Sequence, residues 1–196
     1  MTFLKSSFVI LGLAFASPGF AVEMGDDGLH KQPWFEDTFL DMQEDLADAA
    51  AEGKDLLLLF EQRGCPYCKE LHEVNFERAE ITDYIQDNYY VVQLNLWGDR
   101  EVTDFDGEVM SERDLAKKWF IQFTPTTAMY TLDNGVPESF ADAEAMRLPG
   151  YFKPFHYMTA LEYVVSDSYQ TGGFQKFLQA RADRMRAEGL EVDIWN

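Results

Sequence analysis

The chain has 196 residues, which is long enough for one domain with a sizeable hydrophobic core and short for two. Apolar residues make up 46% of the sequence and aromatic residues 15%, a composition that excludes a disordered protein. The formal net charge of −19 argues against nucleic acid and anionic lipid as partners. Such a charge favours basic partners, or it reflects only a solvated acidic surface.

Residues 1–21 have the pattern of a secretory signal peptide. One lysine precedes the apolar stretch 8–16, and Gly19 and Ala21 supply the small residues of a cleavage site after Ala21. The apolar stretch is short for a membrane span, so an uncleaved anchor is the less favoured alternative. We therefore expect a periplasmic protein that is not inserted in the membrane after cleavage.

The first helix is predicted to follow a polar lead-in. Residues 22–32 contain glycine and charged residues, and we expect them to be mobile. Pro33 can open a helix, because its missing N–H is tolerated at the first helical position. An amphipathic stripe follows at helical spacing, formed by Phe35, Phe39, Met42, Leu46 and Ala49. Gly53 ends the predicted helix.

The next stretch carries both cysteines of the chain. The apolar run 56–60 predicts a buried strand, and after a turn the motif Cys65-Pro66-Tyr67-Cys68 opens a helix. A helix N-terminus offers unpaired N–H groups and the positive end of the dipole, which lower the pKa of a thiol placed there. Cys65 is thus the candidate nucleophile. Cys68, one turn further on, can resolve a mixed disulfide.

Two other interpretations of the cysteine pair are weaker. A structural disulfide stabilises most when it closes a long loop, whereas this pair closes a short one. A zinc site needs more ligands, and the nearest candidate is His72, because His30 and His156 lie far away in sequence. The strand, CxxC and helix context favours redox chemistry, and we expect no metal.

The second half of the chain alternates strands and helices. Ile81, Tyr84 and Ile85 suggest a further helix, and residues 89–96 predict a strand parallel to the first. Residues 97–110 are polar and contain an Asp-Gly turn signal, so we expect an inserted loop or small hairpin. Ser111 caps a helix that follows. The acidic residues of the segment 97–110 do not have the spacing of a calcium loop.

The remaining elements run to the carboxyl terminus. A strand is predicted over 126–132, with a turn at 133–135 and a partner strand that includes Phe140. Residues 154–165 predict a helix, and Gly172-Gly173 separates it from a last amphipathic helix within the extension 172–189. We expect that helix to pack on the domain, although it could offer a surface to a partner.

Two motifs carry a resemblance to a known family. Cys65-Pro66-Tyr67-Cys68 after an apolar strand, and Thr124-Pro125-Thr126 before a second one, resemble the thioredoxin superfamily over residues 34–165. The stretch LLLLFEQRGCPYCKEL, together with LPGYF nearer the carboxyl terminus, is similar to the sequences of periplasmic thioredoxin-like proteins of the sulfur-oxidation (Sox) system, the SoxW type. The resemblance implies a thioredoxin-like α/β fold over 33–196, with a central mixed β-sheet flanked by helices.

The resemblance also assigns roles to individual residues. It implies that Pro125 is a cis-proline opposite the CxxC motif, and that Thr124 offers backbone groups to a substrate strand. Thioredoxins usually carry a buried acid six residues before the first cysteine, where this chain has Leu59. Glu61 could replace it from the opposite face of the strand, or could lie at the solvated end. Arg63 and Lys69 flank the motif and could stabilise a thiolate.

The functional hypothesis is a periplasmic thiol–disulfide oxidoreductase that mainly reduces partner-protein disulfides. It needs no cofactor beyond the Cys65–Cys68 disulfide, and we expect a monomer. The resemblance implies sulfur-oxidation proteins as substrates and a membrane electron donor of the DsbD or CcdA type. The alternatives are an oxidase or isomerase with the same site, a non-enzymatic carrier that holds copper or zinc on the thiols, and a scaffold with a retired active site.

Overall fold

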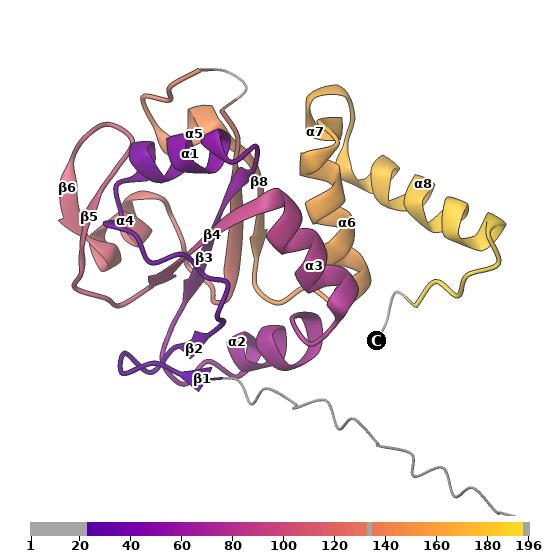
Figure 1. The fold of residues 1–196 in the computed structure, drawn as a ribbon, viewed down its shortest axis with the longest axis horizontal. Coiled ribbons are helices and arrows are strands. Elements are labelled where there is room, and N and C mark those ends of the chain that lie inside the picture. The colour runs from indigo at the N-terminus through magenta and orange to yellow at the C-terminus, as the bar shows by residue number, and fades with distance from the viewer. Residues whose placement is uncertain (1–22, 133–134, 194–196) are drawn as a thin grey trace, which may run out of the picture.

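A four-stranded mixed sheet forms the centre of the molecule (Figure 1). The computed structural model describes residues 23–132 and 135–193. The strand order is β4 (Tyr89–Asn95), β3 (Asp55–Glu61), β7 (Thr126–Tyr130) and β8 (Glu144–Pro149). β4 is parallel to β3, whereas β7 and β8 are antiparallel to their neighbours. The predicted thioredoxin-like fold is confirmed.

Helices cover both faces of this sheet. Alternate side chains of β3 therefore enter two separate hydrophobic cores, one on each face. Leu56, Leu58 and Phe60 point into the first core, beneath α1 (Met42–Ala51) and α4 (Glu112–Lys118). Leu57 and Leu59 point into the second core. That core lies beneath a group of helices formed by α2 (Pro66–Glu70), the π-helical turn η1 (Leu71–Asn75), α3 (Ala79–Asn88) and α6 (Pro154–Val165). A strand buried on both faces reads as a continuous apolar run, as 56–60 does.

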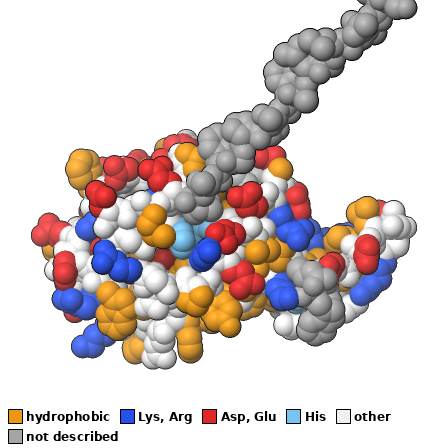
Figure 2. All heavy atoms as spheres, turned by 90° about the horizontal axis from the view of Figure 1, so that it is seen from below, with side chains coloured by type: hydrophobic (Ala, Val, Ile, Leu, Met, Phe, Trp, Pro, Cys, Tyr) orange, Lys and Arg blue, Asp and Glu red, His pale blue; other side chains and the backbone are white. Residues whose placement is uncertain are grey.

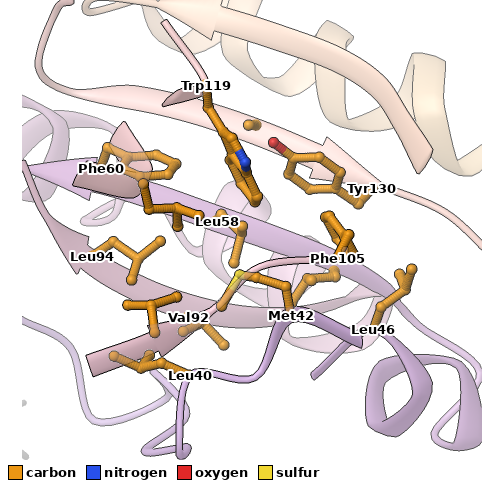
Figure 3. Packing of buried hydrophobic residues seen from close by; sticks show 14 of the residues in the cluster. Leu40, Met42, Leu46, Leu58, Phe60, Val92, Leu94, Phe105, Trp119 and Tyr130 are labelled. Atoms are coloured by element: carbon orange, nitrogen blue, oxygen red, sulfur yellow. The ribbon is translucent and has the colours of Figure 1, made fainter. Parts of the chain in front are cut away.

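Aliphatic and aromatic side chains pack together in the first core (Figure 3). Trp119 is fully buried and stacks on Phe105, with the ring centroids 5.7 Å apart. The Trp119 indole N–H donates to the Asp104 carboxylate at 3.1 Å, which satisfies its polar atom inside the core. Phe105 and Asp104 belong to the segment 97–110, so the inserted segment contributes to the core.

That segment forms a hairpin of β5 (Glu101–Thr103) and β6 (Val109–Ser111), paired antiparallel. The Lys118 ammonium closes the turn by ion pairs to Asp104 at 2.6 Å, Asp106 at 2.6 Å and Glu108 at 2.9 Å. A lysine on α4 therefore offsets part of the negative charge of the turn. Ser111 caps α4 as expected, by accepting the Asp114 backbone N–H at 3.2 Å.

The first helix begins later than the sequence pattern predicts. α1 starts at Met42, and its N-cap is Asp41, whose carboxylate accepts the N–H groups of Gln43 and Glu44. Upstream of it, the Glu36 backbone N–H donates to the Val91 carbonyl at 2.8 Å, so this part of the chain is held along the outer edge of β4. The predicted helix over 33–40 is wrong because the sheet edge takes these backbone groups. Phe39, which the stripe placed in the core, is 93% exposed.

The expected mobile lead-in also differs from the structure. Residues 23–31 form a hairpin of β1 (Glu23–Met24) and β2 (His30–Lys31). Leu29 is buried, and the His30 carbonyl accepts a hydrogen bond from the Gln93 side chain at 2.7 Å. Polar contacts with β4 therefore anchor a segment that has no apolar periodicity of its own. The predicted signal peptide, residues 1–21, lies outside the described residues.

The partner strand of β7 is not the one expected. Phe140 lies in the short helix α5 (Phe140–Ala143), and the strand that pairs with β7 is β8, further along the chain. The Phe140 ring packs on the Trp119 ring, with the centroids 5.3 Å apart. The side chain thus reaches the core from a helix, without a strand. Part of the predicted turn, residues 133–134, lies outside the described residues. The strand assignment for Phe140 is therefore wrong.

The carboxyl-terminal helices pack on α6 (Figure 1), whose bounds match the prediction. α7 (Ser168–Thr171) and α8 (Phe174–Ala187) follow it, separated by Gly172-Gly173. Tyr163 of α6 contacts the rings of Phe174 and Phe177, and Arg181 pairs with Glu162 at 2.6 Å. Trp195 lies outside the described residues. Among the helices in the described part of the chain, none has the length and apolarity required to cross a membrane.

Asp45 of α1 makes the stability of the fold depend on pH. Its carboxylate is buried and accepts a hydrogen bond from the Thr38 hydroxyl at 3.2 Å. Burial raises the pKa of Asp45 from 3.8 to about 7, and the carboxylates of Asp41 and Asp48 add to the effect. The folded state therefore holds a proton that the unfolded state has released, and stability is lost as the pH rises from about 4 through 7.

We expect Asp45→Asn to remove this part of the pH dependence. The variant's melting temperature should fall less than that of the wild type between pH 4 and 7, as measured by thermal unfolding followed by circular dichroism. The oxygen of the asparagine amide can still accept the hydrogen bond from the Thr38 hydroxyl. The comparison therefore isolates the effect of ionising Asp45. A steeper fall for the variant would contradict this assignment.

Candidate functional site

The two cysteines lie where β3 leads into α2. Cys65 is the N-cap of α2, and Pro66 occupies the first turn, where its missing N–H leaves no bond unmade. The Cys68 backbone N–H donates to Cys65 Sγ at 3.0 Å. Cys65 and Cys68 are joined by a disulfide, with their Cα atoms 5.2 Å apart. The geometry therefore places the Cys65 sulfur at a helix N-terminus, as the sequence predicts.

The two sulfur-bearing residues differ in exposure. Cys65 is 5% exposed and Cys68 is 1% exposed, so Cys65 is the more accessible of the pair. The two residues between them are exposed to solvent. Tyr67 stacks on Tyr151, with ring centroids 6.3 Å apart, which links the CxxC turn to the segment after β8. A partner can approach this end of the molecule most directly at Cys65.

Thr124 and Pro125 lie beside Cys65. The Thr124–Pro125 peptide bond is cis, as the resemblance implies. The Thr124 hydroxyl donates to Cys65 Sγ at 3.3 Å, and the Thr124 carbonyl oxygen lies 3.5 Å from the same sulfur. The structure thus brings together the two motifs that are far apart in sequence. An oxygen donor beside Cys65 can stabilise negative charge on that sulfur.

Glu61 is buried and lies on the same face of β3 as Leu59, not on the opposite face. Residues two apart on a strand share a face, so the two alternatives considered from the sequence are both wrong. His72, also fully buried, places Nε2 3.2 Å from each carboxylate oxygen of Glu61. Cys68 and His72 are four residues apart on the same helical segment, which puts both on its buried side.

Further polar groups complete this buried cluster. The Gln32 amide lies 3.1 Å from His72 Nδ1, and the Gln93 amide donates to the Glu61 carboxylate. The Lys31 ammonium donates to the side-chain amide oxygen of Gln93, Oε1, at 2.6 Å. If the Gln32 N–H donates to Nδ1, the imidazole proton is on Nε2 and points at Glu61. Gln32, which directly follows the β1–β2 hairpin, thereby orients the His72 ring toward Glu61.

The histidine next to this cluster has a perturbed pKa. The His30 ring lies 5.3 Å from the His72 ring, with a tilted arrangement. Burial lowers the pKa of His30, and the neighbouring His72 adds to the decrease, whereas Glu61 opposes it. The sequence pattern suggested His72 only as a metal ligand and gave no indication of Gln32, Gln93 or Lys31. The spacing of Cys68 and His72 was the one available signal.

The flanking basic residues do not turn toward the disulfide. Arg63 lies against the N-terminal hairpin, with Nε 3.4 Å from the Asp27 carbonyl oxygen. Lys69 pairs with Glu73 at 3.5 Å on the exposed side of the helix. Their predicted role in tuning Cys65 stays a prediction. Within residues 23–132 and 135–193, no group of three or more His, Cys, Asp or Glu side chains is arranged to hold a metal ion.

This end of the molecule combines apolar and charged surface. Figure 2 views the molecule from the end at which α2 lies in Figure 1, and hydrophobic side chains gather there in patches between acidic and basic ones. The Cys65–Cys68 disulfide can accept two electrons and two protons, which converts it into two thiols that stay on the protein. Its parts are an accessible sulfur at a helix start, a buried second sulfur and a hydroxyl beside the first.

Comparison with solved structures finds thioredoxin folds. A thioredoxin-fold protein from Helicobacter pylori matches with a TM-score of 0.53 and 23% identity, over 74% of this chain and 95% of that one. A thioredoxin from Thermus thermophilus matches with a TM-score of 0.49 and 21% identity, over 62% and 81%. The periplasmic thioredoxin SoxS from Paracoccus pantotrophus matches with a TM-score of 0.37 and 21% identity, over 59% and 99%. At these identities, the likeness concerns the fold.

A comparison of the sequence with family models also finds a thioredoxin-like domain. No curated protein matches the chain. The model of the thioredoxin-like domain matches residues 42–165, which include all four strands of the central sheet, both cysteines and the cis-proline. The hairpin β1–β2 and the helices α7 and α8 lie outside the matched part. The chain belongs to the family of thioredoxin-like domains.

Proposed function

We propose that this protein is a periplasmic thiol–disulfide oxidoreductase that reduces disulfides of partner proteins. The observation that carries the proposal is the position of the Cys65 sulfur. It caps α2, accepts the Cys68 N–H and lies 3.3 Å from the Thr124 hydroxyl. These donors favour a thiolate at Cys65 over a thiol, and the thiolate is the form that attacks disulfides.

The reaction begins from the dithiol form. The Cys65 thiolate attacks one sulfur of a partner disulfide, which forms a mixed disulfide and releases the partner's other sulfur as a thiolate that takes up a proton. Cys68 then loses its proton and attacks the Cys65 sulfur. This step forms the Cys65–Cys68 disulfide and releases the second partner thiol. Two electrons pass from the protein to the partner, and two thiol protons follow them.

A return path for electrons is required, because each turnover leaves the disulfide form. We propose a membrane electron donor of the DsbD or CcdA type, and sulfur-oxidation proteins among the substrates. Their support is the sequence likeness described above and the signal-peptide pattern of residues 1–21. In this proposal the protein acts as a monomer and uses no cofactor beyond Cys65 and Cys68.

An equilibrium redox titration tests the direction of electron flow. The protein is equilibrated in glutathione and dithiothreitol buffers, and the dithiol fraction is measured by alkylation and mass spectrometry. We expect a potential of roughly −200 mV or lower, in the range of glutaredoxins and thioredoxins. A value near about −120 mV would instead indicate an oxidase of disulfide-forming type. Stoichiometric copper or zinc on reduced protein that lacks disulfide-reducing activity would favour the metal carrier.

A further inference from the structure

An aromatic groove lies next to the candidate active site. It has a volume of about 730 Å³ and runs between the end of β4 and α4. Trp97 and Phe120 line it, and they are 63% and 75% exposed. Phe123, close by in the same connection to β7, is 60% exposed. Three large aromatic side chains in solvent over so short a distance exceed the scattered exposure that an ordinary surface shows.

Two links connect the groove to the site. The Trp97 indole N–H donates to the Gln62 side chain at 2.6 Å, and the Gln62 carbonyl accepts the Cys65 backbone N–H at 3.3 Å. On the other side, Phe123 directly precedes Thr124, whose hydroxyl donates to Cys65 Sγ. A chain segment bound in the groove therefore lies next to the sulfur that would attack it.

The backbone at Phe120 shows that folding alone does not account for this side chain. Phe120 follows the C-terminal end of α4 with φ +57°, and the Ile121 N–H closes the helix end on the Ala116 carbonyl at 2.8 Å. Glycine is the residue that this left-handed position favours, and a bulky side chain there is uncommon. Since the Phe120 ring is mostly in solvent, little burial compensates for the backbone cost.

Basic side chains accompany the aromatic ones. Arg113 and Lys117 of α4 line the groove in a chain that has 35 acidic and 16 basic residues; the acidic lining residue Asp114 accepts a hydrogen bond from the Ser111 hydroxyl at 2.7 Å. Arg113 is paired with Asp99 at 3.1 Å, whereas no ion pair of Lys117 is found within the described part of the chain. An occupant with a carboxylate near Lys117 would complement this charge, and a basic residue there would be disfavoured.

We propose that this groove binds the disulfide-bearing segment of a partner protein in extended form, with an apolar side chain between Trp97 and Phe120 and an acidic side chain beside Lys117. The inference rests on the proposed function and names the partner sequence that the site prefers. Aromatic residues that are exposed before binding and buried after it supply much of the affinity in such contacts. Selectivity would then come from the groove and reactivity from Cys65.

Phe120→Gly is the decisive variant, because docking and folding predict opposite changes. Single-turnover reduction is measured with a synthetic peptide that carries one disulfide flanked by Leu and Asp, and with hydroxyethyl disulfide, which is too small to fill the groove. We expect the rate constant for the peptide to fall about tenfold, as for loss of a binding hot spot. The rate for hydroxyethyl disulfide should stay within about twofold, and the melting temperature should be equal to or above that of the wild type.

Two matched variants complete the design. Phe39→Gly removes an aromatic side chain that is 93% exposed and does not line the groove, and it should leave both rates unchanged. Lys117→Glu should reverse the preference between the Leu-Asp peptide and a peptide with Lys in place of Asp. The charge reversal is on the exposed face of α4, so it tests the groove in a protein with an intact backbone.

Each other outcome overturns the inference. Equal peptide rates for the wild type and Phe120→Gly would show that the groove does not dock substrate, while reduction of hydroxyethyl disulfide would leave the proposed function standing. A lower melting temperature together with loss of both rates would make Phe120 structural. A wild-type dimer that becomes a monomer in Phe120→Gly, measured by light scattering, would assign the groove to a second copy. Failure of the wild type on both probes would refute the proposed function itself.

Discussion

Replacement of Cys65 by serine is expected to abolish disulfide reduction, with a loss of at least about a thousandfold. The serine hydroxyl stays protonated near neutral pH and cannot attack a disulfide, whereas the cysteine in this position has two hydrogen-bond donors that favour its thiolate. Reduction of insulin disulfides by dithiothreitol, catalysed by the protein, measures the effect. The fold should be retained, because serine can cap the helix in place of Cys65.

Cys68→Ser is the matched control for this result. The variant keeps the attacking thiolate but lacks the thiol that resolves the mixed disulfide, so it should accumulate a covalent adduct with its substrate. Non-reducing gel electrophoresis detects that adduct. If Cys65→Ser retains turnover, or if Cys68→Ser rather than Cys65→Ser loses the first step, the assigned roles are wrong. A scaffold with a retired site would show no effect of either substitution.

Truncation of His72 to alanine is expected to destabilise the fold by about 3–5 kcal/mol, because the buried Glu61 carboxylate loses a hydrogen-bond partner and the missing ring leaves a cavity. Glu61 and His72 are both buried, and the His72 Nε2 lies 3.2 Å from each Glu61 carboxylate oxygen. Without the imidazole, the carboxylate keeps the Gln93 amide as its one hydrogen-bond partner among the described residues, and a cavity remains. Urea denaturation measures the loss, and a change below about 1 kcal/mol would contradict the importance of the pair.

A double substitution separates the polar pair from its packing. Replacing both residues, as in Glu61→Leu with His72→Leu, removes the charge and its partner together and should recover much of the stability that His72→Ala loses. The double variant also tests a chemical role for Glu61. If the carboxylate takes the proton of Cys68, this variant should accumulate the mixed disulfide with a changed pH profile of its resolution. An unchanged profile would restrict the pair to a structural role.

Much of the fold is readable from the sequence where local and tertiary preferences agree. The apolar run at 56–60, the helix start at Cys65 and the helix over 154–165 appear in the structure at the expected places. Each of these elements buries its side chains with a clear period, so a wrong assignment would leave apolar residues in water. The cis bond before Pro125 followed from the family resemblance and not from spacing.

The errors lie where a distant segment competes for the backbone or the side chain. The apolar stripe from Phe35 predicts a helix, but the edge of β4 holds Glu36 in an extended conformation. Phe140 was placed in a strand, although its ring packs on Trp119 from a short helix. The lead-in looked mobile because its anchors, above all Gln93, are more than sixty residues away. Local pattern has no information on such partners.

The amino-acid sequence by itself determined where the disulfide of this protein lies, because a pair of cysteines two residues apart at a helix start is a local arrangement that neighbouring residues specify. Only the tertiary structure decided what surrounds that pair. It placed Thr124 against Cys65, Glu61 against His72, and the aromatic groove beside the disulfide. These contacts join residues whose proximity depends on strand pairing and on helix packing, and no spacing along the chain encodes either.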